Sequence, residues 1–118
     1  MDGRIFSLKK IFKEKLNHDW TAEEMAETAQ LSTPHFQKLF KTQVGTPPVT
    51  YLREIRLEKA RELLENSHYQ IKQIGVQVGM TNDSHLTRDF KKKFGLTPTE
   101  YRKRHWEKSQ AEEQFGQK

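Results

Sequence analysis

The sequence of 118 residues contains no cysteine. This absence excludes disulfide cross-links, thiolate metal sites and cysteine nucleophiles, and it suits a reducing cytosol. No apolar run approaches the roughly 20 residues that a membrane-spanning helix needs. The N-terminus also lacks the apolar segment of a signal peptide. We therefore expect a cytoplasmic protein with no part in a membrane.

Motifs that carry chemistry are scarce as well. The sequence has no Gly-rich phosphate loop, and no Ser, His and Asp set that its helices would obviously gather. The histidines lack the spacing of a metal-binding motif such as HExxH. We therefore expect no catalytic residue, metal site or cofactor, and an enzyme is the least favoured class of function. The histidines concerned are His18, His35, His68, His85 and His105.

What the sequence does have is an excess of positive charge. Lys and Arg number 21 against 16 Asp and Glu, which gives a net charge of +5 and a pI near 9.5. A basic domain of this kind is a candidate for binding a polyanion. A protein-interaction module with an incidental basic face is an alternative. An RNA-binding module fits less well, because Phe and Tyr fall at core positions by period, not on an exposed stacking platform.

The apolar residues recur with a helical period throughout, and no segment alternates as a strand would. Capping boxes at Thr21/Glu24 and Thr97/Glu100 mark helix starts, and Pro34 suits a first turn after a cap at Thr33. Glycines end three helices at Gly45, Gly79 and Gly95. The polar segment 108–118 is expected to be a disordered tail. The expected helices are 5–16, 22–29, 33–44, 48–65, 71–78, 83–94 and 98–106.

One arrangement of helices occurs twice. Each copy reads as a helix, a short turn, a longer helix, a glycine and a helix started by proline, and the turn is one residue longer in the second copy. Two helices joined by a tight turn, on a basic chain, have the form of a helix-turn-helix DNA reader. Phe36, Phe40, Gly45, Pro48 and Tyr51 of the first copy correspond to Leu86, Phe90, Gly95, Pro98 and Tyr101 of the second.

The second helix of each copy has an apolar face and an opposite polar face. The core faces carry Phe36, Leu39, Phe40 and Val44, and then Leu86, Phe90 and Phe94. Arg, Lys, Gln, Ser and Thr, which can contact bases or phosphates, occupy the opposite faces. These polar faces, with their flanks, carry Pro34, His35, Gln37, Lys38 and Lys41, and then Ser84, His85, Thr87, Arg88 and Lys91.

The helix expected at 48–65 has apolar residues on two flanks. Tyr51, Leu52 and Ile55 lie on one side, whereas Leu57, Ala60 and Leu64 lie on the other. A helix of this kind can contact both copies and join them without a flexible linker. Arg56 and Lys59 fall inside the apolar arc, so their stems must lie along apolar surface while their charged groups reach water.

The segments LSTPHFQKLFKTQVG, RLEKARELL, IKQIGVQVGM and SHLTRDFKKKFGLTPTEYR carry a family resemblance. They resemble the DNA-binding domain of AraC/XylS-type bacterial transcription regulators, over about residues 5–104. The resemblance implies an all-α fold of seven helices, with two helix-turn-helix subdomains at 5–46 and 70–107 joined by a connecting helix at 47–66. It further implies that the helices at 33–44 and 83–94 enter successive major grooves of promoter DNA.

The resemblance also assigns roles to residues. Carried over by position, the base contacts come from Pro34, Gln37 and Lys38 in the first copy and from Asp83, Ser84, Thr87 and Arg88 in the second. Backbone contacts are expected from His35, Lys41, His85, Lys91 and Lys92. The implied partners are double-stranded promoter DNA and RNA polymerase. Family members often carry a separate effector or dimerisation domain, and the sequence fits both a stand-alone regulator and the C-terminal part of a longer one.

Four positions depart from the family pattern. Gly75 stands where Ala is usual, and Met80 stands where Phe is usual. Pro34 replaces a side chain that could hydrogen-bond a base, and Lys38 replaces an Arg and so loses the bidentate geometry of a guanidinium. The first copy is therefore expected to bind more through phosphates and DNA shape than through base contacts.

Overall fold

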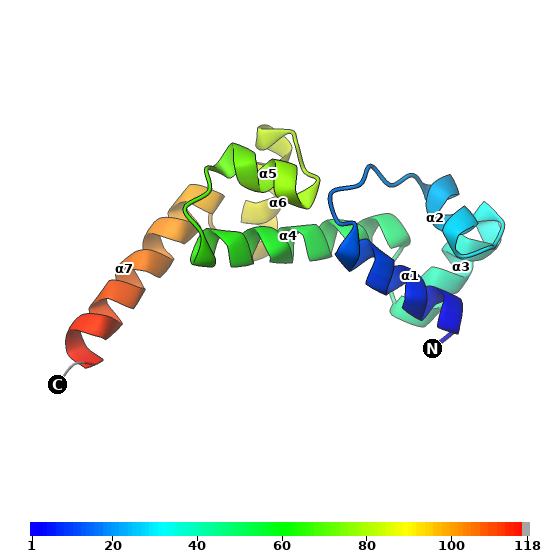
Figure 1. Cartoon of the computed structure of the whole chain (residues 1–118), viewed down its shortest axis with the longest axis horizontal. Helices are drawn as coiled ribbons and strands as arrows, with labels where there is room; N and C mark the ends of the chain where they lie inside the picture. The colour runs from blue at the N-terminus through cyan, green and yellow to red at the C-terminus, as the bar shows by residue number, and fades with distance from the viewer. Residues whose placement is uncertain (117–118) are drawn as a thin grey trace. The chain divides into compact units, whose positions relative to one another are not determined.

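The computed structural model describes residues 1–116, with side chains up to Glu112. This part of the chain contains α-helices and no β-strand, so the all-α prediction is confirmed (Figure 1). The seven helices are α1 (Gly3–Glu14), α2 (Ala22–Thr28), α3 (Thr33–Val44), α4 (Pro48–Asn66), α5 (Ile71–Val78), α6 (Asp83–Phe94) and α7 (Pro98–Gly116).

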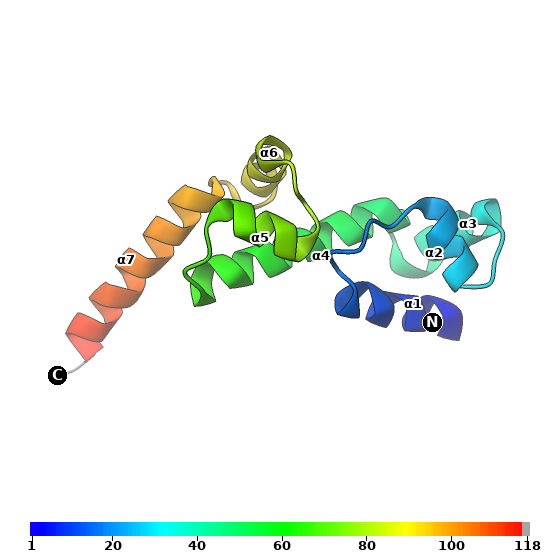
Figure 2. The ribbon, with the colours of Figure 1, turned by 45° about the horizontal axis from the view of Figure 1, so that its top comes forward.

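The chain forms two compact units, Met1–Arg56 and the part from Leu57 onward, with the boundary inside α4. In the first unit, α2 and α3 pack against each other (Figure 2). The core of this unit is rich in aromatic rings. The ring centroids of Phe40 lie 6.4 Å from Phe12 and 5.5 Å from Tyr51. The buried core residues are Ile5, Leu8, Phe12, Met25, Ala26, Ala29, Phe36, Phe40 and Leu52.

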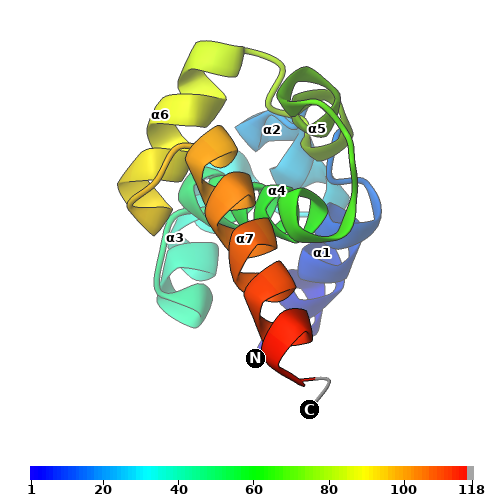
Figure 3. The same ribbon diagram turned by 90° about the vertical axis from the view of Figure 1, so that its left-hand side faces the viewer.

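The second unit has a smaller aromatic core built on the same plan. The Phe90 ring lies 4.6 Å from Phe94 and 5.6 Å from Tyr101 between centroids, so Tyr101 packs the start of α7 against α6. The ribbon shows α7 beginning beside α6 (Figure 3). The Tyr101 hydroxyl donates to Glu65 on α4 at 2.7 Å. The buried apolar residues of this unit are Leu57, Ala60, Leu64, Ile74, Val78, Leu86 and Phe90.

The apolar arc predicted that the charged group of Arg56 reaches water, but the structure differs. Arg56 is half-buried, and its guanidinium donates to the carbonyl of Leu16 at 3.0 Å and to that of His18 at 2.7 Å. Burial lowers the pKa of Arg56. Lys59, by contrast, is exposed and pairs with Glu62 at 3.4 Å. Arg56 therefore satisfies the Leu16 carbonyl after the end of α1 and shares the His18 carbonyl with the Trp20 N–H, which donates to it at 3.0 Å.

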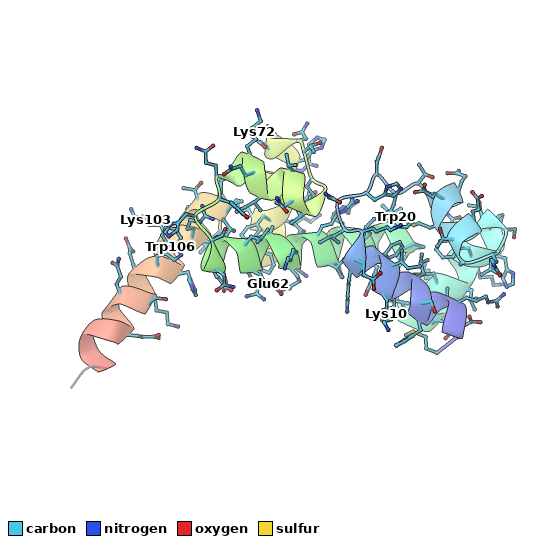
Figure 4. The ribbon with its side chains drawn as sticks, viewed as in Figure 1. Lys10, Trp20, Glu62, Lys72, Lys103 and Trp106 are labelled. Carbon is cyan, nitrogen blue, oxygen red and sulfur yellow. The ribbon has the colours of Figure 1, made fainter. Side chains whose placement is uncertain are left out.

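Each unit closes the end of its first helix with one Arg and one Trp, an arrangement we term the Arg–Trp clasp. In the first unit the Trp20 indole donates to the Lys15 carbonyl at 3.0 Å, beside the Arg56 contacts. In the second unit Trp106 donates to the Glu65 carbonyl at 3.3 Å (Figure 4). Its Arg is Arg102, which donates to the carbonyls of Leu63, Leu64, Ser67 and Tyr69.

The predicted glycine stops are confirmed. Gly45, Gly79 and Gly95 have φ of 98°, 84° and 83°, in the left-handed region that favours glycine. The first copy has Gln30 at the position that Gly79 occupies in the second, and it adopts φ of 60°. The turn of the first unit therefore has the same backbone geometry with a residue less suited to it.

Two helix starts and one capping box differ from the sequence prediction. Ser32, not Thr33, caps α3, because its side chain accepts from the His35 N–H and Thr33 is already helical. Thr21 caps α2 as predicted, but the Glu24 carboxylate pairs with the His18 ring instead of completing the capping box. Helix α1 begins at Gly3, because the Asp2 carboxylate caps it by accepting from the Arg4 N–H at 2.8 Å.

The predicted capping box of α7 is complete. The Thr97 N–H donates to Glu100 at 3.1 Å, and the Glu100 N–H donates to the Thr97 hydroxyl at 3.2 Å. Hydrogen bonds from the side chain and backbone of Thr97 lower the pKa of Glu100, and the positive charges of Lys91 and Arg104 add to this effect. The cap therefore stabilises the fold above the ordinary pKa of a glutamate, and this contribution is lost as pH falls through the lowered value.

We expect Thr97→Ala to raise the pKa of Glu100 toward its ordinary value, because the side-chain hydrogen bond of Thr97 and the cap geometry are lost. An NMR titration of the Glu100 carboxyl carbon measures this change. Thr99→Ala is the matched control, since Thr99 is exposed on the same turn and makes no capping bond among the described residues. An unchanged Glu100 pKa in Thr97→Ala would contradict the assignment of the shift to this cap.

The structure describes most of the segment 108–118 as helical, where the sequence predicted a disordered tail. Helix α7 continues to Gly116, and only residues 117–118 of the segment 108–118 lie outside the described residues. The segment contains Lys, Gln, Ala and Glu, which favour helix, and neither Gly nor Pro interrupts it before Gly116. The polarity of the segment does not prevent helix formation.

Candidate nucleic-acid interface

Helix α3 presents the polar face that its period predicts. Phe36 and Phe40 are fully buried, and Leu39 and Val44 pack against the core of the first unit. The opposite side of the helix is therefore free to meet a partner. All five predicted contact residues of this helix are exposed: Pro34, His35, Gln37, Lys38 and Lys41.

Helix α6 is built in the same way in the second unit. The Asn82 side chain caps it by accepting from the His85 N–H at 3.0 Å, which matches the role of Ser32 in α3. Leu86 and Phe90 are fully buried and anchor the opposite face. The predicted base-contacting residues of α6 line one shallow hollow at its N-terminal half: Asp83, Ser84, Thr87 and Arg88. Thr87 is half-buried, and the other three are exposed.

The three consecutive lysines near the end of α6 are not equivalent. Lys93 lies 4.0 Å from the Glu58 carboxylate and 5.6 Å from the centroid of the Phe94 ring, so its charge is directed toward its own unit. Lys91 and Lys92 are exposed, and within the described residues neither forms an ion pair. The predicted assignment of these two to phosphate contacts is therefore compatible with their surroundings.

Asp89, beside the hollow, was not among the residues predicted from the sequence to contact DNA. The Asp89 carboxylate oxygen Oδ1 lies 3.4 Å from Nε of Arg88. The Asp89 side chain is 21% exposed, whereas that of Arg88 is 68% exposed. Residues adjacent in a helix normally point in different directions, so the sequence pattern gave no signal for this pair.

The described residues contain no group of three or more His, Asp and Glu side chains that could hold a metal ion. Up to residue 116, no helix is both long and apolar enough to cross a membrane. The features that remain are the two exposed helix faces, which have a basic and hydrogen-bonding character.

Two helix pairs, each with a tight turn and an exposed polar second helix, define a helix-turn-helix protein. A family profile described as a helix-turn-helix domain matches residues 25–104. The chain therefore belongs to the AraC-type helix-turn-helix family. A solved transcriptional regulator of Chromobacterium violaceum, described as having an AraC-type DNA-binding domain, is 26% identical with a TM-score of 0.79. The match covers 86% of this chain and 91% of that one.

Other relatives agree with this assignment. The C-terminal domain of the response regulator yesN from Fusobacterium nucleatum is 28% identical, with a TM-score of 0.80, over 86% of this chain and 99% of that one. An uncharacterised HTH-type transcriptional regulator of Haemophilus influenzae is 34% identical over 86% of this chain and 34% of its own length. The activator RclR of Escherichia coli is 34% identical over 77% of this chain and 32% of its own length. The chain thus spans about a third of these curated relatives.

Proposed function

We propose that this chain is a sequence-specific, double-stranded DNA-binding regulator of transcription that contacts promoter DNA through α3 and α6. The observation that carries the proposal is the repetition of one exposed polar face, at matching positions, on the second helix of both units. A single basic face is common on solvated helices. Two such faces, one at the same position in each copy of a repeated unit, match what a DNA-binding protein with two recognition helices requires. A solved neighbour with the same fold, the DNA-binding domain of AdpA, is bound to a target DNA.

In this proposal each of the two helices enters a major groove, the two grooves being successive ones along the promoter. Residues near the N-terminus of a recognition helix meet base edges, and more distal basic residues meet phosphates. The proposed base-contacting residues are Pro34, Gln37, Lys38, Asp83, Ser84, Thr87 and Arg88. The proposed backbone-contacting residues are His35, Lys41, His85, Lys91 and Lys92.

The two units are proposed to contribute unequally. Pro34 offers no side-chain hydrogen bond to a base, and Lys38 offers a point charge where Arg88 offers a planar fork. The hollow lined by Asp83, Ser84, Thr87 and Arg88 contains both donors and acceptors. We therefore assign most of the base discrimination to the second unit and a larger share of phosphate and shape contacts to the first.

The proposal extends to the regulator as a whole. The relatives are named as bacterial transcriptional regulators, and their chains are about three times as long as the part matched here. We propose that the chain acts in the bacterial cytoplasm, that RNA polymerase is its functional partner, and that an effector or dimerisation domain acts with this domain where one is present.

Salt-dependent binding to promoter fragments tests the proposed function. Each neutralised phosphate contributes about −0.9 to the slope of log affinity against log salt concentration. We expect a steep negative slope, with affinity for selected sequences above that for unselected ones. No measurable binding to any duplex at about 50 mM salt, where such contacts are strong, would overturn the proposal.

We expect Lys92→Ala to weaken binding to all sequences alike and to reduce the salt slope by about 1, because one phosphate contact is lost. Lys93→Ala is the matched control. Lys93 has the same charge on the same turn, but its ammonium is directed to Glu58. Fluorescence anisotropy over a salt series measures both slopes. Equal slope changes in the two variants would contradict the assignment of Lys92 to the DNA backbone.

A further inference from the structure

Asp89 places a carboxylate beside the proposed DNA-reading face, where it is electrostatically unfavourable for binding phosphates. It lies in the middle of α6, far from the first turn, so it does not cap the helix or offset the partial positive charge of its N-terminus. Among the described residues, its one ion-pair and hydrogen-bond partner is Arg88. A role that explains this carboxylate must therefore act through Arg88.

The geometry leaves a particular part of Arg88 available. Its Nε–H is directed at Asp89 Oδ1, at a nitrogen–oxygen distance of 3.4 Å. The two terminal nitrogens, Nη1 and Nη2, are then the groups that remain for a partner. The Arg88 side chain is 68% exposed, and Arg88 lines the hollow together with Asp83, Ser84 and Thr87. Its terminal edge can therefore approach a ligand end-on.

We infer that Asp89 is a positioning residue, which holds Arg88 so that Nη1 and Nη2 donate together to O6 and N7 of a guanine in the major groove. This inference rests on the proposed function and extends it to one base. Arg is suited to this bidentate contact, since its planar fork matches the two guanine acceptors. Holding the guanidinium before DNA arrives lowers the conformational entropy that binding must remove from a long side chain.

The first unit provides an internal comparison, because the repeat places Lys38 and Leu39 where the second unit has Arg88 and Asp89. An ammonium lacks the fork, and Leu39 packs against the core of its unit. Neither half of the Arg88–Asp89 arrangement is present in the first unit. Guanine discrimination of this kind therefore belongs to the second unit.

The inference predicts opposite effects on two kinds of DNA. Removing the Asp89 carboxylate frees Arg88 to adopt many rotamers, which lowers the preference for guanine at one position. The same change removes a negative charge close to phosphates, which leaves binding to unselected DNA equal or stronger. Loss of a purely structural residue would weaken binding to both kinds of DNA together.

The experiment begins with selection from a randomised duplex pool by the full chain and by Asp89→Ala, Asp89→Asn and Arg88→Lys. Affinities are then measured for the selected duplex, for the same duplex with the guanine pair replaced by an adenine pair, and for one unselected duplex. Thermal unfolding confirms that each variant is folded. Asp89→Asn is the conservative variant, since its amide oxygen can still accept from Nε of Arg88.

We expect the wild-type chain to prefer guanine over adenine at one position by about tenfold or more, as bidentate contacts do. Asp89→Ala should lower that preference several-fold with undiminished binding to the unselected duplex. Asp89→Asn should retain most of the preference, and Arg88→Lys should lose it. An unaltered guanine preference in Asp89→Ala, or an equal loss of affinity for selected and unselected duplexes, would overturn the inference about Asp89 but not the proposed function. A wild-type chain that binds no duplex would instead overturn the proposed function beneath it.

Discussion

Arg102→Ala is expected to destabilise the second unit by about 3 kcal/mol, since charged hydrogen bonds contribute about 1.5–3 kcal/mol each and are not additive. The Arg102 guanidinium donates to the carbonyls of Leu63, Leu64, Ser67 and Tyr69, and it lies 5.1 Å from the centroid of the Trp106 ring. These carbonyls lie at the end of α4 and in the following loop, so one substitution removes the Arg102 hydrogen bonds to all four, although the Leu63 carbonyl still accepts from the N–H and hydroxyl of Ser67. Burial lowers the pKa of Arg102, as expected for a cation withdrawn from water.

Urea unfolding followed by circular dichroism measures this loss. Arg102→Lys should recover only part of it, because an ammonium keeps the charge but cannot reach several separated carbonyls in one plane. Arg104→Ala is the matched control, since Arg104 is exposed on the same helix. If Arg102→Ala were no more harmful than Arg104→Ala, the Arg–Trp clasp would not be a main stabiliser of this unit.

Gly75→Ala is expected to destabilise the protein by about 2–3 kcal/mol, at the upper end of the range for overpacking. Helix propensity predicts the opposite sign, a gain of about 1 kcal/mol for Ala over Gly inside a helix. The structure decides between them: a Cβ at position 75 would lie 2.5 Å from the Met80 backbone oxygen. The Met80 N–H donates to the Gly75 carbonyl at 2.8 Å, so the turn between α5 and α6 is closed directly over this residue.

The control for this substitution is Gly3→Ala. Gly3 also lies in a helix, but a Cβ added there would meet nothing within 4 Å. We expect it to be neutral or slightly stabilising in the same urea experiment. A stabilised Gly75→Ala would show that the turn can open without strain, and would leave the departure from the usual Ala without a structural cause.

Local signals in the sequence predicted most of the fold. The left-handed stops at Gly45, Gly79 and Gly95 and the Thr97–Glu100 cap depend on neighbours a few residues away, and all four are confirmed. The alternative caps Ser32 and Thr33 carry the same hydroxyl, so residue type alone could not distinguish them. The predicted end of α7 came too early, because its C-terminal segment is polar and its helix propensity was the local signal there.

Features that depend on distant partners were not predicted. The carbonyls that Arg56 and Arg102 reach are far from them in sequence, and helical period showed only that Arg56 lies in an apolar arc. For the candidate interface, period predicted the buried anchors of α3 and α6 and the exposure of the opposite faces, except that Thr87 is half-buried. It did not predict the Arg88–Asp89 pair, because side-chain rotamers, not helix faces, bring those groups together.

Because the boundary between the units falls inside α4, no single cut separates them into independent pieces. The first half of this helix contributes Tyr51, Leu52 and Ile55 to one core, and the second half contributes Leu57, Ala60 and Leu64 to the other. A cut after Arg56 would leave two helical stubs, each shorter than the roughly 12 residues at which an isolated helix becomes even marginally stable. The second stub would also begin with uncapped N–H groups. A fragment that contains the first unit and a fragment that contains the second must therefore each include the whole of α4. The two fragments then overlap in sequence over this helix.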